Sequence, residues 1–182
     1  MKKTTTIINL ELKHYCADFS KIRKVLLELG AVKDRVVKQK DYYFVLPEEK
    51  SKNRARLKLR VEGGVMYLVY YERPDFIFGK DTTSDGGYLV VEKEMLNFLK
   101  RSLGVIAVIE KKREVWKKKN TVFHLDEVKD VGGIFEIELQ KRGKINEKDR
   151  KEFSIYQNKV LPYLGPVVNG SNIDLVKKTQ NK

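Results

Sequence analysis

Hydrophobic and polar residues alternate, with a period of two, along several segments of the chain. In the first, residues 7–16, Leu10 and Leu12 alternate with Glu11 and Lys13. Successive side chains of a β-strand point to opposite faces, so this pattern predicts a strand with one apolar and one charged face. The same pattern predicts strands at residues 36–46, 54–62, 65–73, 105–117, 121–128 and 134–140.

Other segments have the spacing of an amphipathic helix. Phe19, Ile22 and Val25 would share one face of a helix that Asp18 caps and Gly30 ends. The remaining predicted elements are helices at residues 92–103 and 147–164, a short helix capped by Ser171, a hairpin turn at Gly63–Gly64, and loops at residues 47–53 and 74–87.

Charges of one sign recur on the polar faces of these strands. Arg56, Lys58 and Arg60 share one face of a predicted strand, and Glu136 and Glu138 share one face of another. Like charges along a face repel each other unless opposite charges lie across from them. A barrel with its charged faces inward would provide this arrangement. We therefore predict an α+β fold, a closed antiparallel eight-stranded β-barrel (a tunnel) with a charged interior and flanking helices. A sheet whose charged face lies in solvent is the alternative.

The composition narrows the class of protein. With 182 residues, of which 41% are hydrophobic, the chain is long enough to bury a core, and we expect one domain over residues 1–182. No run of 18 apolar residues is present, so no membrane span is expected. Cys16, His14 and His124 are too few for a disulfide framework or a zinc site. The first residues do not resemble a secretion signal, which favours a cytoplasmic location.

The net charge of +13 predicts an anionic partner. Nucleic acid, a phosphate-rich small molecule and an acidic membrane surface are the candidate classes. The excess of basic residues is spread along the chain, and basic strands that face acidic ones inside a barrel would be poorly placed for a duplex. A small polyphosphate with a divalent cation fits this pattern better, and the sequence leaves a homodimer open.

Seven short motifs and the end of the chain carry a resemblance to a known family over about residues 7 to 176. The motifs are Asn9–Lys13, Gln39–Tyr43, Leu57–Arg60, Tyr70–Asp75, Glu110–Arg113, His124–Val128 and Gly132–Glu138. In this order and spacing they resemble the CYTH domain family, a tunnel-fold group that includes class IV adenylyl cyclases and thiamine or inorganic triphosphatases.

The resemblance implies roles for individual residues. A divalent cation, Mg²⁺ or Mn²⁺, would be bound by Glu11, Glu136 and Glu138, together with Asn9, which stands where the family has a glutamate and contributes an oxygen without charge. The triphosphate would be bound by Lys13, Arg56, Lys58, Arg60, Arg73 and Lys80. The catalytic residues would be Lys111, Arg113 and Asp126, with Asp126 near the reacting end.

Three functions follow as hypotheses. The first is a class IV adenylyl cyclase, which converts ATP to cyclic AMP and pyrophosphate; the segment Ser171-Asn172-Ile173-Asp174-Leu175 resembles the end of such enzymes. The second is a triphosphatase that hydrolyses thiamine triphosphate, tripolyphosphate or a nucleoside triphosphate. The third is a binder of nucleic acid or polyphosphate without enzymatic activity. The charged strands fit the first two equally well.

Overall fold

The computed structural model describes residues 7–52, 54–72, 82–141, 144–168, 170–171 and 173–175, with the backbone alone at residues 7–9, 51–52 and 82–85. Within these residues the chain forms eight strands: β1 (Ile7–Tyr15), β2 (Val32–Phe44), β3 (Ala55–Glu62), β4 (Val65–Glu72), β5 (Thr82–Val91), β6 (Val105–Lys118), β7 (Thr121–Val128) and β8 (Gly132–Lys141). The helices are α1 (Phe19–Glu28), α2 (Glu48–Lys52), α3 (Glu94–Leu103), α4 (Glu147–Val160) and a 3₁₀ turn, Leu161–Tyr163.

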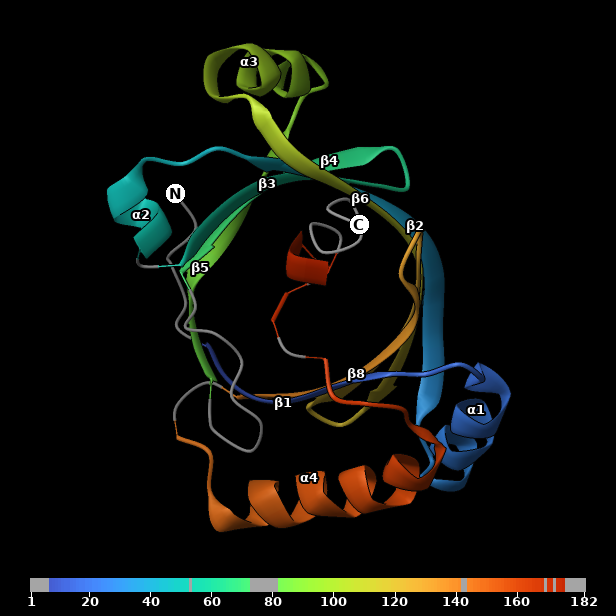
Figure 1. The fold of residues 1–182 in the computed structure, drawn as a ribbon. Helices are drawn as coiled ribbons and strands as arrows, with labels where there is room; N and C mark the ends of the chain where they lie inside the picture. The colour runs from blue at the N-terminus through green and yellow to red at the C-terminus, as the bar shows by residue number, and fades with distance from the viewer. Residues whose placement is uncertain are drawn as a thin grey trace.

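All the strand pairs are antiparallel, and the pairing order is β1-β5-β4-β3-β2-β6-β7-β8, with β8 also next to β1 (Figure 1). β1 pairs with β8 from Ile8 to Tyr15 but with β5 only from Ile7 to Asn9, so the pairing at the β1–β5 junction is short. The predicted antiparallel eight-stranded sheet with flanking helices is confirmed. Hydrogen bonding along the whole β1–β5 junction, which a closed barrel would require, is not shown.

Two predicted loops contain regular structure, and these predictions were wrong. Residues 82–87 of the loop predicted at residues 74–87 belong to β5, which has no alternating pattern of its own and forms by pairing with β4, whereas residues 74–81 lie outside the described residues. Gly86 is required there, because a Cβ atom at this position would lie 2.4 Å from the backbone oxygen of Tyr70. The loop predicted at residues 47–53 contains α2, a single turn that is too short to show a helical period.

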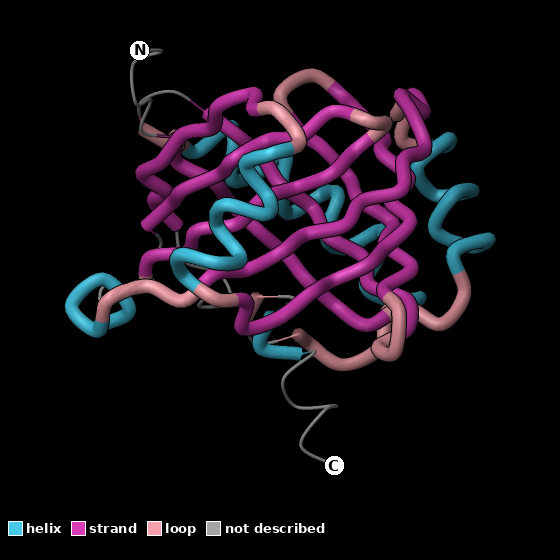
Figure 2. Tube along the Cα trace, turned by 90° about the horizontal axis from the view of Figure 1, so that it is seen from above, coloured by secondary structure: helices cyan, strands magenta, loops and turns pink. Residues whose placement is uncertain are grey.

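The apolar faces of the strands lie outward, where α1, α3 and α4 cover them. Figure 1 and Figure 2 show these helices outside the sheet. Leu12, Phe123 and Phe135 are fully buried in the cluster that α1 and α4 cover. A second cluster joins Leu59 of β3 to Leu99 of α3. Burial of these side chains is the main stabilising contribution on this side of the sheet, and it leaves the charged faces to line the interior. None of the described helices is long and apolar enough to cross a membrane.

The last residues that the structure describes, including a short helix at residues 173–175, lie inside the ring of strands (Figure 1). Val168 donates a backbone hydrogen bond to the carbonyl of Lys13, and Ile173 and Leu175 are buried against Tyr43 and Ile109. This apolar C-terminal segment, residues 166–175 as described, therefore fills one end of the interior. The charged part of the interior lies beyond it.

Candidate functional site

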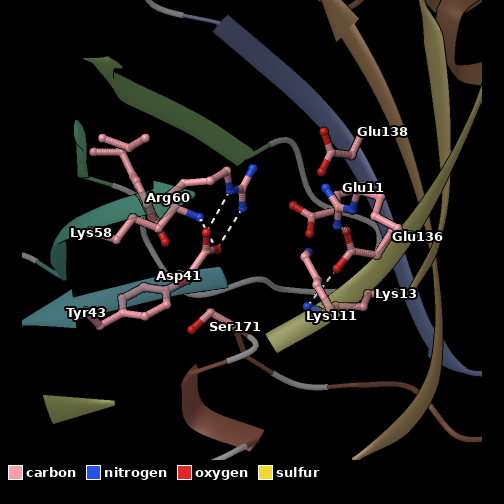
Figure 3. A pocket seen from close by; sticks show the side chains of 13 residues that line it. Glu11, Lys13, Asp41, Tyr43, Lys58, Arg60, Lys111, Glu136, Glu138 and Ser171 are labelled. Carbon is pink, nitrogen blue, oxygen red and sulfur yellow. Dashed lines mark hydrogen bonds and ion pairs between the residues drawn. The ribbon is translucent and has the colours of Figure 1, made fainter. Parts of the chain in front are cut away.

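A cavity of about 300 Å³ lies within the ring of strands. Its lining is dominated by charged side chains that point toward one another from different strands, as Figure 3 shows. The lining residues are Glu11, Lys13, Asp41, Tyr43, Lys58, Arg60, Val69, Tyr71, Lys111, Arg113, Glu136, Glu138 and Ser171. The prediction that the charged strand faces converge on one interior space is confirmed.

Asp41 of β2 orders the cations of β3 on one side of the cavity. Arg60 lies opposite Asp41 in the strand register and donates from Nε and Nη2 to its two carboxylate oxygens, each at 2.7 Å. Lys58 donates from Nζ to Oδ2 of the same carboxylate at 2.9 Å. Bidentate pairing of this kind fixes the plane of the guanidinium, so Arg60 is held in place before any ligand binds.

Asp126 of β7 orders the cations of β6 in the same way. Arg113, its register partner, donates from Nε and Nη2 at 2.6 Å each, and Lys111 donates from Nζ at 2.8 Å. Arg113 Nη2 also reaches Glu136 at 3.0 Å, and Glu136 pairs with Lys13 at 2.8 Å. The two sides of the cavity thus repeat one arrangement, a Lys-x-Arg strand beside a strand that carries one aspartate.

Burial and these pairings shift the pKa values of the groups. Burial alone would raise the pKa of Asp126, but Arg113 and Lys111 outweigh it and hold that pKa below its usual value. Asp126 has no exposed surface. It is therefore ionised at neutral pH and poorly suited to accept a proton, which makes it a residue that positions Lys111 and Arg113 rather than a general base.

Burial lowers the pKa values of two lysines of the cavity, Lys58 and Lys111. Burial lowers the pKa of Lys58 to about 7, although Asp41 acts in the opposite direction. A lysine of this kind changes its charge near neutral pH, so its contribution to binding an anion depends on pH.

Glu11 and Glu138 are the carboxylates best placed for a divalent cation. They lie opposite each other in the β1–β8 register, and both line the cavity. Glu136 is instead engaged by Lys13 and Arg113. The described residues contain no group of three or more His, Cys, Asp or Glu side chains close enough to hold a metal by themselves. Mg²⁺ is commonly bound by one or two carboxylates together with substrate phosphates, so this pair fits such an ion.

The other predicted site residues are placed as follows. Arg56 does not line the cavity; it lies near the C-terminal segment, with Nη2 4.0 Å from Asp174. The backbone of Asn9 is paired with Gln140, and its side chain lies outside the described part. Arg73 and Lys80 lie outside the described residues.

Sequence reasoning missed several residues of the cavity. Asp41 and Tyr43 stand in a motif that the resemblance uses, yet neither was assigned a role, and Ser171 was expected only to cap a helix. Asp41 could be recognised only from its position opposite Arg60 on the neighbouring strand. That position depends on the strand register, which the pattern along a single strand does not give. His124 was also left aside; its Nε2 lies 3.9 Å from Glu138, and burial lowers its pKa to about 4, so it is neutral.

The fold and the cavity together define a class, an antiparallel β protein whose helices lie outside the sheet and whose interior is rich in cations. The sequence profile of the CYTH domain matches residues 8–158, and the chain therefore belongs to the CYTH domain family. A curated relative, "Putative adenylate cyclase MJ0240" from Methanocaldococcus jannaschii, is 28% identical over 147 residues, which cover 79% of this chain and 83% of the relative.

Solved structures share the fold. The PH1819 protein of Pyrococcus horikoshii OT3 is 23% identical, with a TM-score of 0.74 over 93% of this chain and 98% of that one. A protein of Hippeastrum, "Putative adenylyl cyclase HpAC1", is described as having a dominant triphosphatase activity. It is 13% identical, with a TM-score of 0.66 over 96% of each chain. At these identities the likeness concerns the fold alone.

Proposed function

We propose that this protein is a divalent-metal-dependent enzyme that acts on a triphosphate bound in the charged cavity, with the barrel enclosing the substrate as a tunnel. The observation that carries the proposal is the convergence of Lys13, Lys58, Arg60, Lys111 and Arg113 on one cavity that also contains Glu11 and Glu138. A triphosphate carries about four negative charges near neutral pH, because its terminal phosphate ionises around pH 6. Several fixed cations and one metal ion match that charge.

Different side chains would bind the phosphates and the metal ion. Arg60 and Arg113, oriented by Asp41 and Asp126, would donate to phosphate oxygens from Nη1, which these carboxylates leave available, and the lysines add compact charges. Glu11 and Glu138 would hold Mg²⁺ or Mn²⁺, which polarises a phosphoryl oxygen and acidifies the attacking hydroxyl or water when bound. Catalysis then rests on positioning and charge stabilisation, without a covalent nucleophile.

The first candidate reaction is that of an adenylyl cyclase. The ribose 3′-hydroxyl of ATP would attack the α-phosphorus, and pyrophosphate would leave. The curated relative named for this activity supports it, since it matches most of both chains.

The second candidate is hydrolysis of a triphosphate, in which water attacks the terminal phosphorus, the diphosphate leaves and orthophosphate forms. The Hippeastrum protein, which has a similar fold and is described as having a dominant triphosphatase activity, supports hydrolysis as the second candidate. Both reactions use the same cations and the same metal carboxylates.

A product assay tests the proposal. The protein is incubated with Mg²⁺ or Mn²⁺ and, in parallel, with ATP, tripolyphosphate and thiamine triphosphate. Cyclic AMP with pyrophosphate would select the cyclase, and orthophosphate with a diphosphate would select the triphosphatase. Glu138→Ala and Arg60→Ala should each abolish turnover. Lys112→Ala is the matched control, because Lys112 follows Lys111 on β6 but pairs with Glu127 and is half exposed. Turnover near wild type in Arg60→Ala would place the site elsewhere.

A further inference from the structure

One side of the interior differs from the rest because it carries no charge. Lys58 and Val69 are register partners and both line the cavity, which fixes the inward face of β4. Tyr67 is two residues from Val69 and shares this face, and Tyr88 of β5 is the register partner of Val69. Across the described inward positions of β4 and of β5 from Gly86 onward, no charged side chain is found. We call this surface the aromatic wall: Tyr67, Val69, Tyr71, Tyr88 and Val90.

The aromatic wall is partly open to solvent. Tyr88 is 55% exposed and Val90 is 65% exposed, whereas Tyr43, deeper in the interior, is 3% exposed. The rings of Tyr67 and Tyr88 meet edge to face, with centroids 6.0 Å apart and an interplanar angle of 73°. Val69 and Tyr71 line the cation-lined cavity, and Tyr67, Tyr88 and Val90 continue the same face of β4 and β5 beside it. Contiguous exposed apolar patches of this kind mark ligand-binding surfaces.

We infer that the aromatic wall binds the nucleobase of a nucleoside triphosphate whose phosphates occupy the charged cavity. The inference rests on the proposed function and narrows its substrate class. A bare polyphosphate would make no use of an uncharged side, whereas a base can stack on a tyrosine ring. The neighbouring cations favour a neutral base over the positively charged thiazolium ring of thiamine, since Arg60 lies opposite Tyr67 in the register.

Calorimetry with two non-hydrolysable probes tests this assignment in the presence of Mn²⁺. One probe is the imido analogue of ATP, and the other is the matching imido analogue of inorganic tripolyphosphate. Tyr88→Leu should weaken binding of the ATP analogue by about ten-fold or more, the loss expected for one stacked base, and should change binding of the inorganic analogue less than about two-fold. Tyr88→Phe should bind both probes like the wild type, because stacking needs the ring and not the hydroxyl.

Tyr163→Leu is the matched control, since Tyr163 is a partly exposed tyrosine of the 3₁₀ turn and not part of the aromatic wall. Tyr67→Leu provides a second variant of the wall if Tyr88→Leu fails to fold, as judged by thermal unfolding. Equal weakening of both probes, or of neither, would overturn the inference while leaving the proposed function in place. If thiamine triphosphate displaces the ATP analogue at a lower concentration than ATP does, the choice of a nucleobase would be overturned. If the wild type binds neither probe, the proposed function itself fails.

Discussion

Two buried aspartates determine how the cations of the cavity are arranged. Asp41 and Asp126 each accept hydrogen bonds from Nζ of one lysine and from Nε and Nη2 of one arginine. Removing one partner of a buried ionic cluster leaves uncompensated charge, which costs more than the pair contributes. We therefore expect substitution of either aspartate to lower the free energy of unfolding more than substitution of the lysine or arginine that it binds.

Asp126→Ala should lower the free energy of unfolding by about 3–5 kcal/mol, because Lys111 and Arg113 would remain buried without their main counter-ion. Urea denaturation followed by circular dichroism measures this change. The matched control is Glu147→Ala, which removes an exposed carboxylate from its pair with Lys151 and should have little measurable effect. An unchanged urea midpoint in Asp126→Ala would contradict this expectation, because the stability would then not depend on the Asp126 carboxylate.

Lys58 should make triphosphate binding depend on pH. Its pKa of about 7 means that the side chain is charged below neutral pH and loses its proton as the pH rises. Between about pH 7 and about pH 9 the terminal phosphate is already ionised, so affinity should fall by about ten-fold as one charged hydrogen bond is lost. Lys58→Arg should remove the decline, since arginine stays charged. The same decline in that variant would assign it to another group.

At this scale the sequence predicted the inward cations well, because alternation along one strand fixes which side chains share a face. Alternation placed Arg56, Lys58 and Arg60 on one face, of which Lys58 and Arg60 line the cavity and Arg56 does not. Asp41 could not be recognised in this way, since its role depends on the residue across from it on β3. The division between Glu136, which is engaged in ion pairs, and the pair Glu11 and Glu138 likewise depends on contacts between strands.

Among the elements, the C-terminal segment is the one that sets the depth of the cavity. Ile173 is 1% exposed and packs among apolar side chains of the interior, and Ser171 lines the cavity. The sequence predicted a short helix here but not that it lies inside the sheet, because nothing in a local pattern tells which surface a short apolar segment will cover.

Ile173→Ala should destabilise the protein by about 2–5 kcal/mol, the range for truncation of a fully buried isoleucine. Urea denaturation measures the change, and triphosphate binding at low denaturant reports on the cavity. Ile155→Ala on α4 is the matched control, since Ile155 is 56% exposed. Equal stability of the two variants would mean that the C-terminal segment is not packed inside the sheet.

β5 shows a different limit of sequence reasoning. Its residues are rich in Thr, Ser, Asp and Gly, which favour loops, and the strand exists through its pairing with β4. Tyr67 and Tyr71 can be named from the sequence as tyrosines able to stack on a base, but Tyr88 and Val90 lie on this strand, which the pattern did not predict.

The sheet as a whole turns one set of charged strand faces inward and its apolar faces toward the helices, and this arrangement links stability to pH. The cations hold the pKa values of Asp41, Asp126 and Glu136 below their usual values against the effect of burial. Groups with lowered pKa stabilise the folded state above their unfolded pKa, about 4, and this contribution is lost as the pH falls through the folded values.

The free energy of unfolding should therefore decrease steeply from about pH 4 downward. Urea titrations at a series of pH values, analysed with a constant denaturant slope, measure this dependence. Asp41→Asn should show a shallower decrease, because one of the contributing carboxylates is absent. A stability that stays flat down to about pH 2 would contradict the buried ion pairs.

The central claim is that the inward charges bind a triphosphate through a metal ion. The most direct measurement is a crystal structure of the protein with Mn²⁺ and a non-hydrolysable triphosphate analogue, with anomalous scattering used to locate the metal. We predict phosphate density between Lys58–Arg60 and Lys111–Arg113, and an anomalous peak beside Glu11 and Glu138. An analogue bound instead in the groove lined by Lys38, Lys40 and Lys112, with the interior cavity holding none, would contradict the account.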